Sequence, residues 1–140
     1  MKRVVKKKVD GQVAAGSPAS TLQGLFHSFA RLAEKAGDGR PLLRGLRVAR
    51  DPTADRFVVV HSGARVEFVL VPSDSQPPEA AVECRRMDGG GATETATIAH
   101  FRFNETGVVS ESSVPELVNE RIDQSPAAWS IVAAVLWSAM

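Results

Sequence analysis

Six short runs rich in β-branched and apolar residues lie between residues 42 and 112, and most of them alternate apolar with polar positions. They span 42–50, 56–60, 64–71, 80–87, 94–103 and 107–112. Turn-forming residues separate these runs, and Ser62-Gly63 predicts a tight hairpin between the second and the third. Every connection but one is short, so neighbouring strands are expected to pair antiparallel as a meander.

The alternation gives each predicted strand an inner and an outer side. The inner positions are apolar: Leu46, Val48, Val66, Phe68, Leu70, Val82, Cys84, Ala99, Phe101 and Phe103. The opposite positions carry charged or polar side chains: Arg47, Arg65, Glu67, Glu83, Arg85, His100 and Arg102. This pattern predicts a sheet with one packed face and one open face. All of the outer residues except Glu83 form a candidate contact site for a ligand or partner.

A helical pattern precedes the strands. Ser20-Thr21-Leu22-Gln23 has the spacing of a capping box, with Ser20 as the N-cap. Apolar residues then recur every three or four positions as far as Ala36, and Gly37 is a suitable C-cap. We therefore expect a helix over 21–36 that packs its Leu/Phe face on the sheet.

Two further helices are predicted after the strands. Ser113-Val114-Pro115-Glu116 is a second capping box and predicts a helix over 114–122. Ser125-Pro126 is a typical start for another helix, which continues to residue 140. The predicted fold is α+β: an N-terminal helix, an antiparallel meander sheet of five or six strands, and two C-terminal helices packed on one sheet face. Residues 1–19 are expected to form a basic flexible arm, and 20–140 a single domain.

The last predicted helix is apolar nearly all round, so it must be covered on more than one side. Trp129, Leu136 and Trp137 are candidates for a subunit interface, where tryptophans are enriched as anchors. Burial of these residues within one subunit, by the preceding helix and the loop at 72–78, is the alternative. The sequence leaves both interpretations open.

Composition favours one ordinary domain. The chain has 140 residues, of which 44% are hydrophobic and 24% charged. A single cysteine excludes an internal disulfide, which fits a reducing cytoplasm. No apolar stretch of signal-peptide type follows the basic start, and the last apolar segment is shorter than the roughly 20 residues that span a bilayer. We expect a cytoplasmic protein without a membrane partner.

Charge is divided unevenly along the chain. Residues 1–50 contain eleven Lys/Arg and three Asp/Glu, whereas residues 51–140 contain six and thirteen. Five of the basic residues lie in the first eight positions: Lys2, Arg3, Lys6, Lys7 and Lys8. They are candidates for contact with nucleic acid or another acidic partner. Mutual neutralisation of the two parts in the folded chain is the alternative.

Catalytic and metal-binding motifs are not evident. The sequence has no phosphate-loop pattern, no His-Glu-x-x-His and no paired-cysteine site, so no catalytic residue, cofactor or metal is assigned. Cys84 is predicted on the packed side, away from His100 on the open side. His100 among the arginines and glutamates of the open face could serve as a general base, but a solvated cross-strand polar pair is the favoured interpretation. His27 is expected to be exposed on the polar side of its helix.

These patterns lead to three hypotheses about function. The first is a non-enzymatic protein-interaction protein, of adaptor or chaperone type, that forms a homodimer. The second is a nucleic-acid-associated protein that uses the basic arm. The third is an enzyme or small-ligand binder at the open sheet face around His100. A protein partner is expected, while a homo-oligomer and a nucleic acid remain open.

Overall fold

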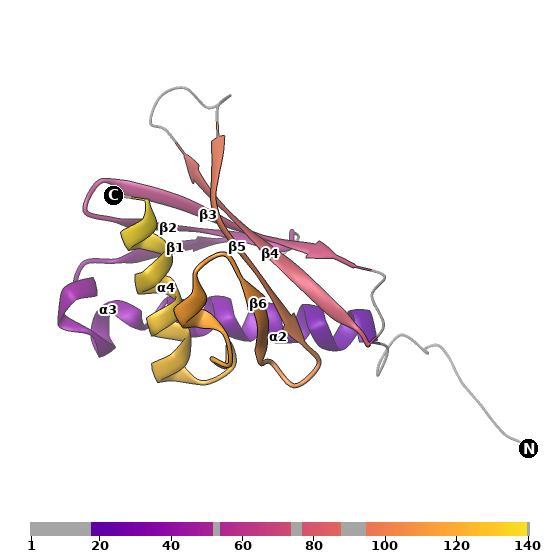
Figure 1. Cartoon of the computed structure of the whole chain (residues 1–140). Helices are drawn as coiled ribbons and strands as arrows, with labels where there is room; N and C mark the ends of the chain where they lie inside the picture. The colour runs from indigo at the N-terminus through magenta and orange to yellow at the C-terminus, as the bar shows by residue number, and fades with distance from the viewer. Residues whose placement is uncertain (1–17, 52–53, 74–76, 88–94, 140) are drawn as a thin grey trace, which may run out of the picture.

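The computed structural model describes residues 18–51, 54–73, 77–87 and 95–139. Helix α2 (Pro18–Ala33) leads into a six-stranded sheet, and helix α4 (Ser125–Ser138) follows it (Figure 1). The strands are β1 (Arg47–Arg50), β2 (Arg56–His61), β3 (Ala64–Pro72), β4 (Glu79–Met87), β5 (Thr95–Asn104) and β6 (Val109–Ser112). They pair antiparallel in chain order, β1-β2-β3-β4-β5-β6. The predicted α+β class and meander are confirmed.

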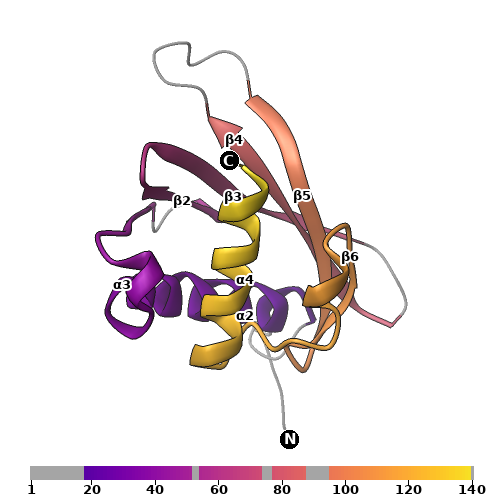
Figure 2. The ribbon, with the colours of Figure 1, turned by 60° about the vertical axis from the view of Figure 1, so that its left-hand side comes forward.

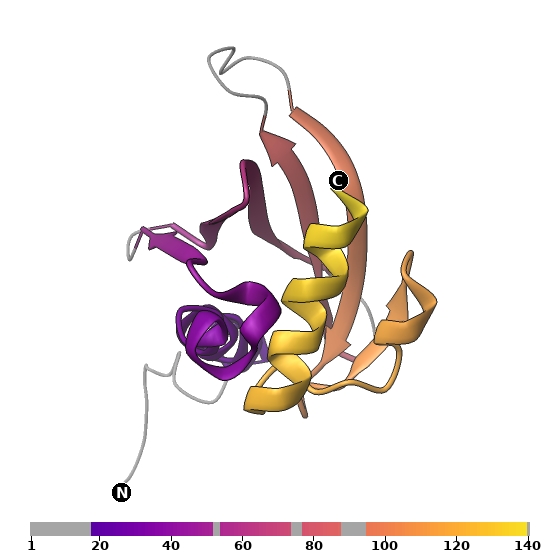
Figure 3. The same cartoon turned by 90° about the vertical axis from the view of Figure 1, so that its left-hand side faces the viewer.

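Both long helices cover the same face of the sheet. Figure 3 shows α2 and α4 on the concave side of the curved strands, and Figure 2 shows α4 crossing α2. The inner positions predicted from the alternation are buried, apart from the half-buried Val48. The opposite face of the sheet is the open face. No helix in the described part of the chain is both long and apolar enough to span a membrane.

Phenylalanine rings join α2 to the sheet. Phe29 of α2 meets Phe57, Phe68 and Phe101 edge-on, with ring centroids 5.6, 5.8 and 6.1 Å away. Phe57 and Phe68 are direct cross-strand neighbours and stack at 4.8 Å. Edge-on and stacked pairs of aromatic rings stabilise a fold by more than the burial of their apolar area alone would. One helical side chain therefore holds strands β2, β3 and β5 to α2.

The N-terminal helix begins and ends earlier than predicted. Its first residue is Pro18, so Ser20 lies inside the helix and is not its N-cap. Proline is well tolerated in the first helical turn, where its missing N–H would have no helical partner. The chain leaves α2 at Ala33 and forms the short helix α3 (Ala36–Gly39). Residues 1–17 of the predicted arm lie outside the described residues.

Only the second half of the first predicted strand, 42–50, forms a strand in the structure. Residues 42–46 do not join β1, because Pro41 starts a 3-10 turn, η1 (Pro41–Leu43). Gly45 then adopts a left-handed φ of 87°, which bends the chain before β1 begins at Arg47. In η1 the adjacent leucines have opposite environments: Leu43 is buried and Leu42 is exposed.

The helix predicted over 114–122 is wrong. The chain makes one 3-10 turn, η2 (Pro115–Leu117), and Asn119 then adopts a left-handed φ of 77°. The following residues pair with the start of β6, as Val109 N–H donates to the Glu120 carbonyl and Asn119 N–H donates to the Val109 carbonyl, each at 2.8 Å. Ser113 is not a helix cap, since its Oγ accepts the His100 N–H at 2.9 Å. This ladder satisfies backbone groups that a helix would otherwise have paired.

Replacing Phe29 with alanine tests the phenylalanine cluster. Loss of a fully buried ring leaves a cavity, so Phe29→Ala is expected to lower the free energy of unfolding by about 3–5 kcal/mol. Urea denaturation followed by circular dichroism measures this change. Val118→Ala is the control, because Val118 is 37% exposed and its truncation should change stability by at most about 0.5 kcal/mol. Equal losses in the two variants would contradict the central role of Phe29.

Candidate functional site

The open sheet face carries two exposed arginines near β1. Arg47 and Arg65 both lie next to Val60 in the register, one on each side, so they occupy one row across three strands. The strand spacing sets their backbones about 10 Å apart. Both side chains are exposed. This end of the open face is therefore basic.

The other charged residues predicted for the open face are mostly engaged in ion pairs. Arg85 Nη2 lies 2.8 Å from Glu83 Oε1, and this hydrogen bond is the main cause of the raised pKa of Arg85. Arg102 reaches Glu79 at 3.3 Å and Ser73 Oγ at 3.0 Å. Such pairs between part-exposed groups add little stability, but they order the side chains.

Glu67 differs from its neighbours because it is buried, with 8% of its surface exposed. Its Oε2 lies 3.4 Å from Nη1 of Arg56 on the adjacent strand. His100 is exposed, and its backbone pairs with Ser113. His100 therefore does not lie in a buried environment, and its exposure lends the enzyme hypothesis no support. In the described part of the chain no group of three or more His, Cys, Asp and Glu residues could hold a metal ion.

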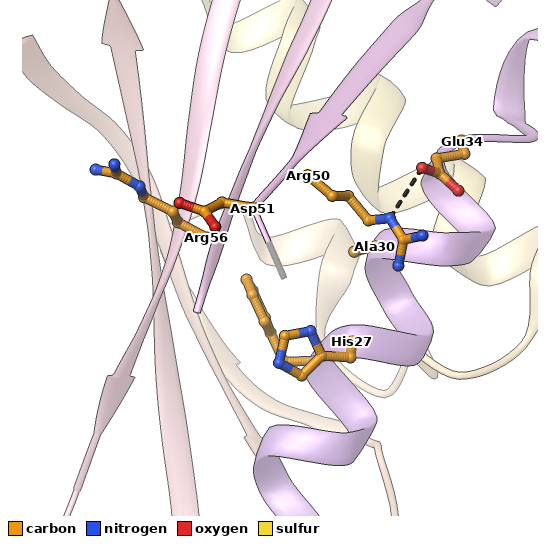
Figure 4. A pocket seen from close by; sticks show the side chains of 7 residues that line it. His27, Ala30, Glu34, Arg50, Asp51 and Arg56 are labelled. Atoms are coloured by element: carbon orange, nitrogen blue, oxygen red, sulfur yellow. Dashed lines mark hydrogen bonds and ion pairs between the residues drawn. The ribbon is translucent and has the colours of Figure 1, made fainter. Parts of the chain in front are cut away.

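A small polar hollow lies between α2 and the β1–β2 strands (Figure 4). It measures about 210 Å³ and is lined by Phe26, His27, Ala30, Glu34, Arg50, Asp51 and Arg56. Arg50 Nε donates to Glu34 Oε2 at 2.9 Å, which joins β1 to the residue that directly follows α2. His27 Nε2 lies 3.1 Å from Asp55 Oδ1, and Gln23 donates to the same carboxylate. These ion pairs and hydrogen bonds hold α2 close to the β1–β2 strands.

His27 was expected to be exposed, and the structure corrects this. Its side chain is about one-third exposed, at 32%, because Asp55 follows β1 and reaches back over α2. The contact joins residues 28 positions apart. Sequence spacing carries no signal for such a pair.

The three predicted interface tryptophan and leucine residues have different environments. Leu136 is fully buried in the core. Trp129 is half-buried, and its Nε1–H donates to the Leu32 carbonyl at 2.8 Å. Trp137 alone stays exposed, at 48%. Of the three, only Trp137 is freely available to a partner.

Trp137 lies next to an exposed leucine from a distant part of the chain. Leu42 of η1 is 73% exposed, and together they line two hollows, of about 460 and 400 Å³. We call this the Leu42–Trp137 surface. The first hollow is completed by His61 and Ser62, and the second by Arg40, Val114, Glu116, Ala133, Ala134 and Ser138. Exposed apolar side chains gathered beside hollows are typical of protein contact sites.

The elements under this surface are braced against one another. Arg40 Nη1 donates to Ser130 Oγ at 3.0 Å, which ties the start of η1 to α4. Gly39 lies directly on the Trp129 ring, where any Cβ would overlap the indole. Leu43 anchors η1 in the core. Contacts within the single chain thus hold the segments that carry Leu42 and Trp137 together.

Sequence reasoning found Trp137 but missed Leu42. The run 42–50 was interpreted as a strand, which would give Leu42 no special exposure. The signals for the correct structure are Pro41 and Gly45, which favour a turn at this position. The five basic arm residues lie outside the described residues, so their role stays a prediction.

Comparisons with protein-family models, with curated proteins and with solved structures found no match to this chain.

Cys84 is expected to be inert in the folded protein. It is buried, and burial raises the pKa of its thiol well above the ordinary value of about 8.5, with a smaller effect from Glu83. Ellman's reagent at mildly alkaline pH should label Cys84 in urea-unfolded protein at once, but in folded protein only as it unfolds. Only the unfolded chain ionises here, so stability should fall as the pH rises above about 8.5. Rapid labelling of the folded protein would contradict this placement.

Two glycines provide a matched test of the braced surface. Gly39→Ala forces a methyl group against Trp129 and should lower the free energy of unfolding by about 1–3 kcal/mol. Displacement of the ring should also shift tryptophan fluorescence to longer wavelength. Gly24→Ala is the control, because its Cβ would meet nothing within 4 Å on helix α2, and it should stabilise by about 0.5–1 kcal/mol. Similar effects from both variants would argue against the Gly39–Trp129 contact.

Proposed function

We propose that this chain is a non-enzymatic protein-interaction protein, and that the Leu42–Trp137 surface is its principal contact with other protein molecules. One observation carries the proposal. Two large apolar side chains, from segments 95 positions apart in the sequence, are exposed together beside two hollows on a braced support. Tryptophan is enriched among the residues that dominate binding energy at protein interfaces.

The geometry of this surface suits an interface better than a buried ligand site. Ligand pockets usually enclose most of the bound molecule. Here Leu42 and Trp137 stand out from the molecule, so they can enter a partner, while the hollows beside them can accept its side chains. Exposed side chains and adjacent hollows are the arrangement found at the centre of interfaces, where anchors fill pockets.

The open sheet face supplies a second, polar contact region in the same proposal. Its exposed arginines Arg47 and Arg65 face away from the helices, and the paired arginines Arg85 and Arg102 lie further along the sheet. Charges at the periphery of a contact mainly accelerate association and select partners. An interaction protein can thus combine an apolar anchor on one side with a polar face on the other.

Photo-crosslinking tests the proposal directly. A benzophenone amino acid at position 42 is expected to give adducts of defined mass with protein in the producing cell. The same group at position 118 is the control, because Val118 is an exposed apolar residue that lines neither hollow. Adding Trp137→Asp should remove the adducts from position 42. Equal adducts from both positions, or none from position 42, would reject the Leu42–Trp137 surface as a contact site.

A further inference from the structure

The Leu42–Trp137 surface has a charge arrangement that points to its occupant. Its second hollow is lined by two side chains of opposite charge, Arg40 and Glu116. Arg40 precedes η1 and Glu116 belongs to η2. Figure 2 shows the segments that carry them on opposite sides of α4. The surface therefore has a basic end, an apolar centre and an acidic end.

We infer that a second copy of this chain occupies the surface around a two-fold axis that passes beside Trp137, an inference that rests on the proposed function. A two-fold interface uses the same patch twice, so the patch must be complementary to itself. Rotation about an axis through the apolar centre sets Arg40 of one copy against Glu116 of the partner subunit. The same rotation sets Glu116 against the partner's Arg40. Like charges do not meet.

The polar groups at the two ends are available for these contacts. Arg40 uses Nη1 to hold Ser130 Oγ at 3.0 Å, and a guanidinium has five N–H donors, so others remain for a carboxylate. Glu116 is exposed on η2. Paired opposite charges across an interface fix the orientation of the two copies, and mismatched charges are strongly unfavourable.

The apolar centre fits the same arrangement. Rotation brings the partner's Trp137 close to the first hollow, which is lined by Leu42, His61 and Ser62. This hollow has a volume of about 460 Å³ and is also lined by Trp137 of its own chain. Ala133 and Ala134 line the second hollow. Their small side chains allow the two α4 helices to approach closely.

Charge reversal tests the orientation. Sedimentation equilibrium over a wide concentration range measures the dimer dissociation constant of the full chain. Arg40→Glu and Glu116→Arg are each expected to raise it about tenfold or more, because each sets like charges together at both ends. The double variant should return to within about threefold of the unaltered protein. Arg31→Glu, on an exposed α2 residue that lines neither hollow, is the matched control and should have no effect.

The outcomes separate this inference from the proposed function. A protein that stays monomeric at all concentrations, but whose position 42 still crosslinks to another protein, overturns the second copy and leaves the proposed function standing. A dimer that forms equally well with Trp137→Asp and with Leu42→Asp overturns the second copy at this surface, and only the absence of adducts from position 42 as well overturns the proposed function. A dimer that these substitutions break, but that the double charge reversal does not restore, overturns the two-fold arrangement.

Discussion

The Trp129 indole holds together the side of the molecule on which the candidate surface lies. Its Nε1–H donates to the Leu32 carbonyl, which also accepts the Lys35 N–H, and its ring lies on Gly39. One side chain of α4 thereby contacts the end of α2 and the end of α3. Because η1 follows α3 directly, the position of Leu42 depends on this contact. A half-buried tryptophan suits this role, since its ring packs while its N–H requires a partner.

The meander also keeps residues that are close in the sequence close together in the described part of the fold. Strands that are neighbours in the sequence are neighbours in the sheet, so the arginines of β1 and its surroundings stay at one edge. The acidic residues after β5 stay at the other. Arg50–Glu34 and Arg102–Glu79 each join residues of one part of the sequence, whereas His27–Asp55 joins the basic first part to the acidic second part. A crossover topology would have interleaved the two sets of charge.

Much of the fold could be predicted because the alternation of apolar residues directly reports which face of a strand is buried. The positions of Phe68, Val82 and Phe101 follow from it. Predictions failed where a local signal competed with tertiary pairing. Ser113 looked like a helix cap, but its hydroxyl pairs with the His100 backbone, and the chain after it completes the edge beside β6. At such positions the local helix propensity is outweighed by backbone hydrogen bonds that form only in the folded sheet.

The candidate site was harder to predict, because its residues come from four separate segments. Spacing in the sequence cannot show that Leu42, His61, Glu116 and Trp137 share one surface. This separation has a consequence for the order of events during synthesis. Each strand of the meander pairs with the strand before it in the sequence, so its partner has already been synthesised when it emerges. A nascent chain that ends before α4 lacks Trp137 and the support of Trp129, so its Leu42–Trp137 surface is incomplete. Under the proposed function, association through this surface would follow the synthesis of α4.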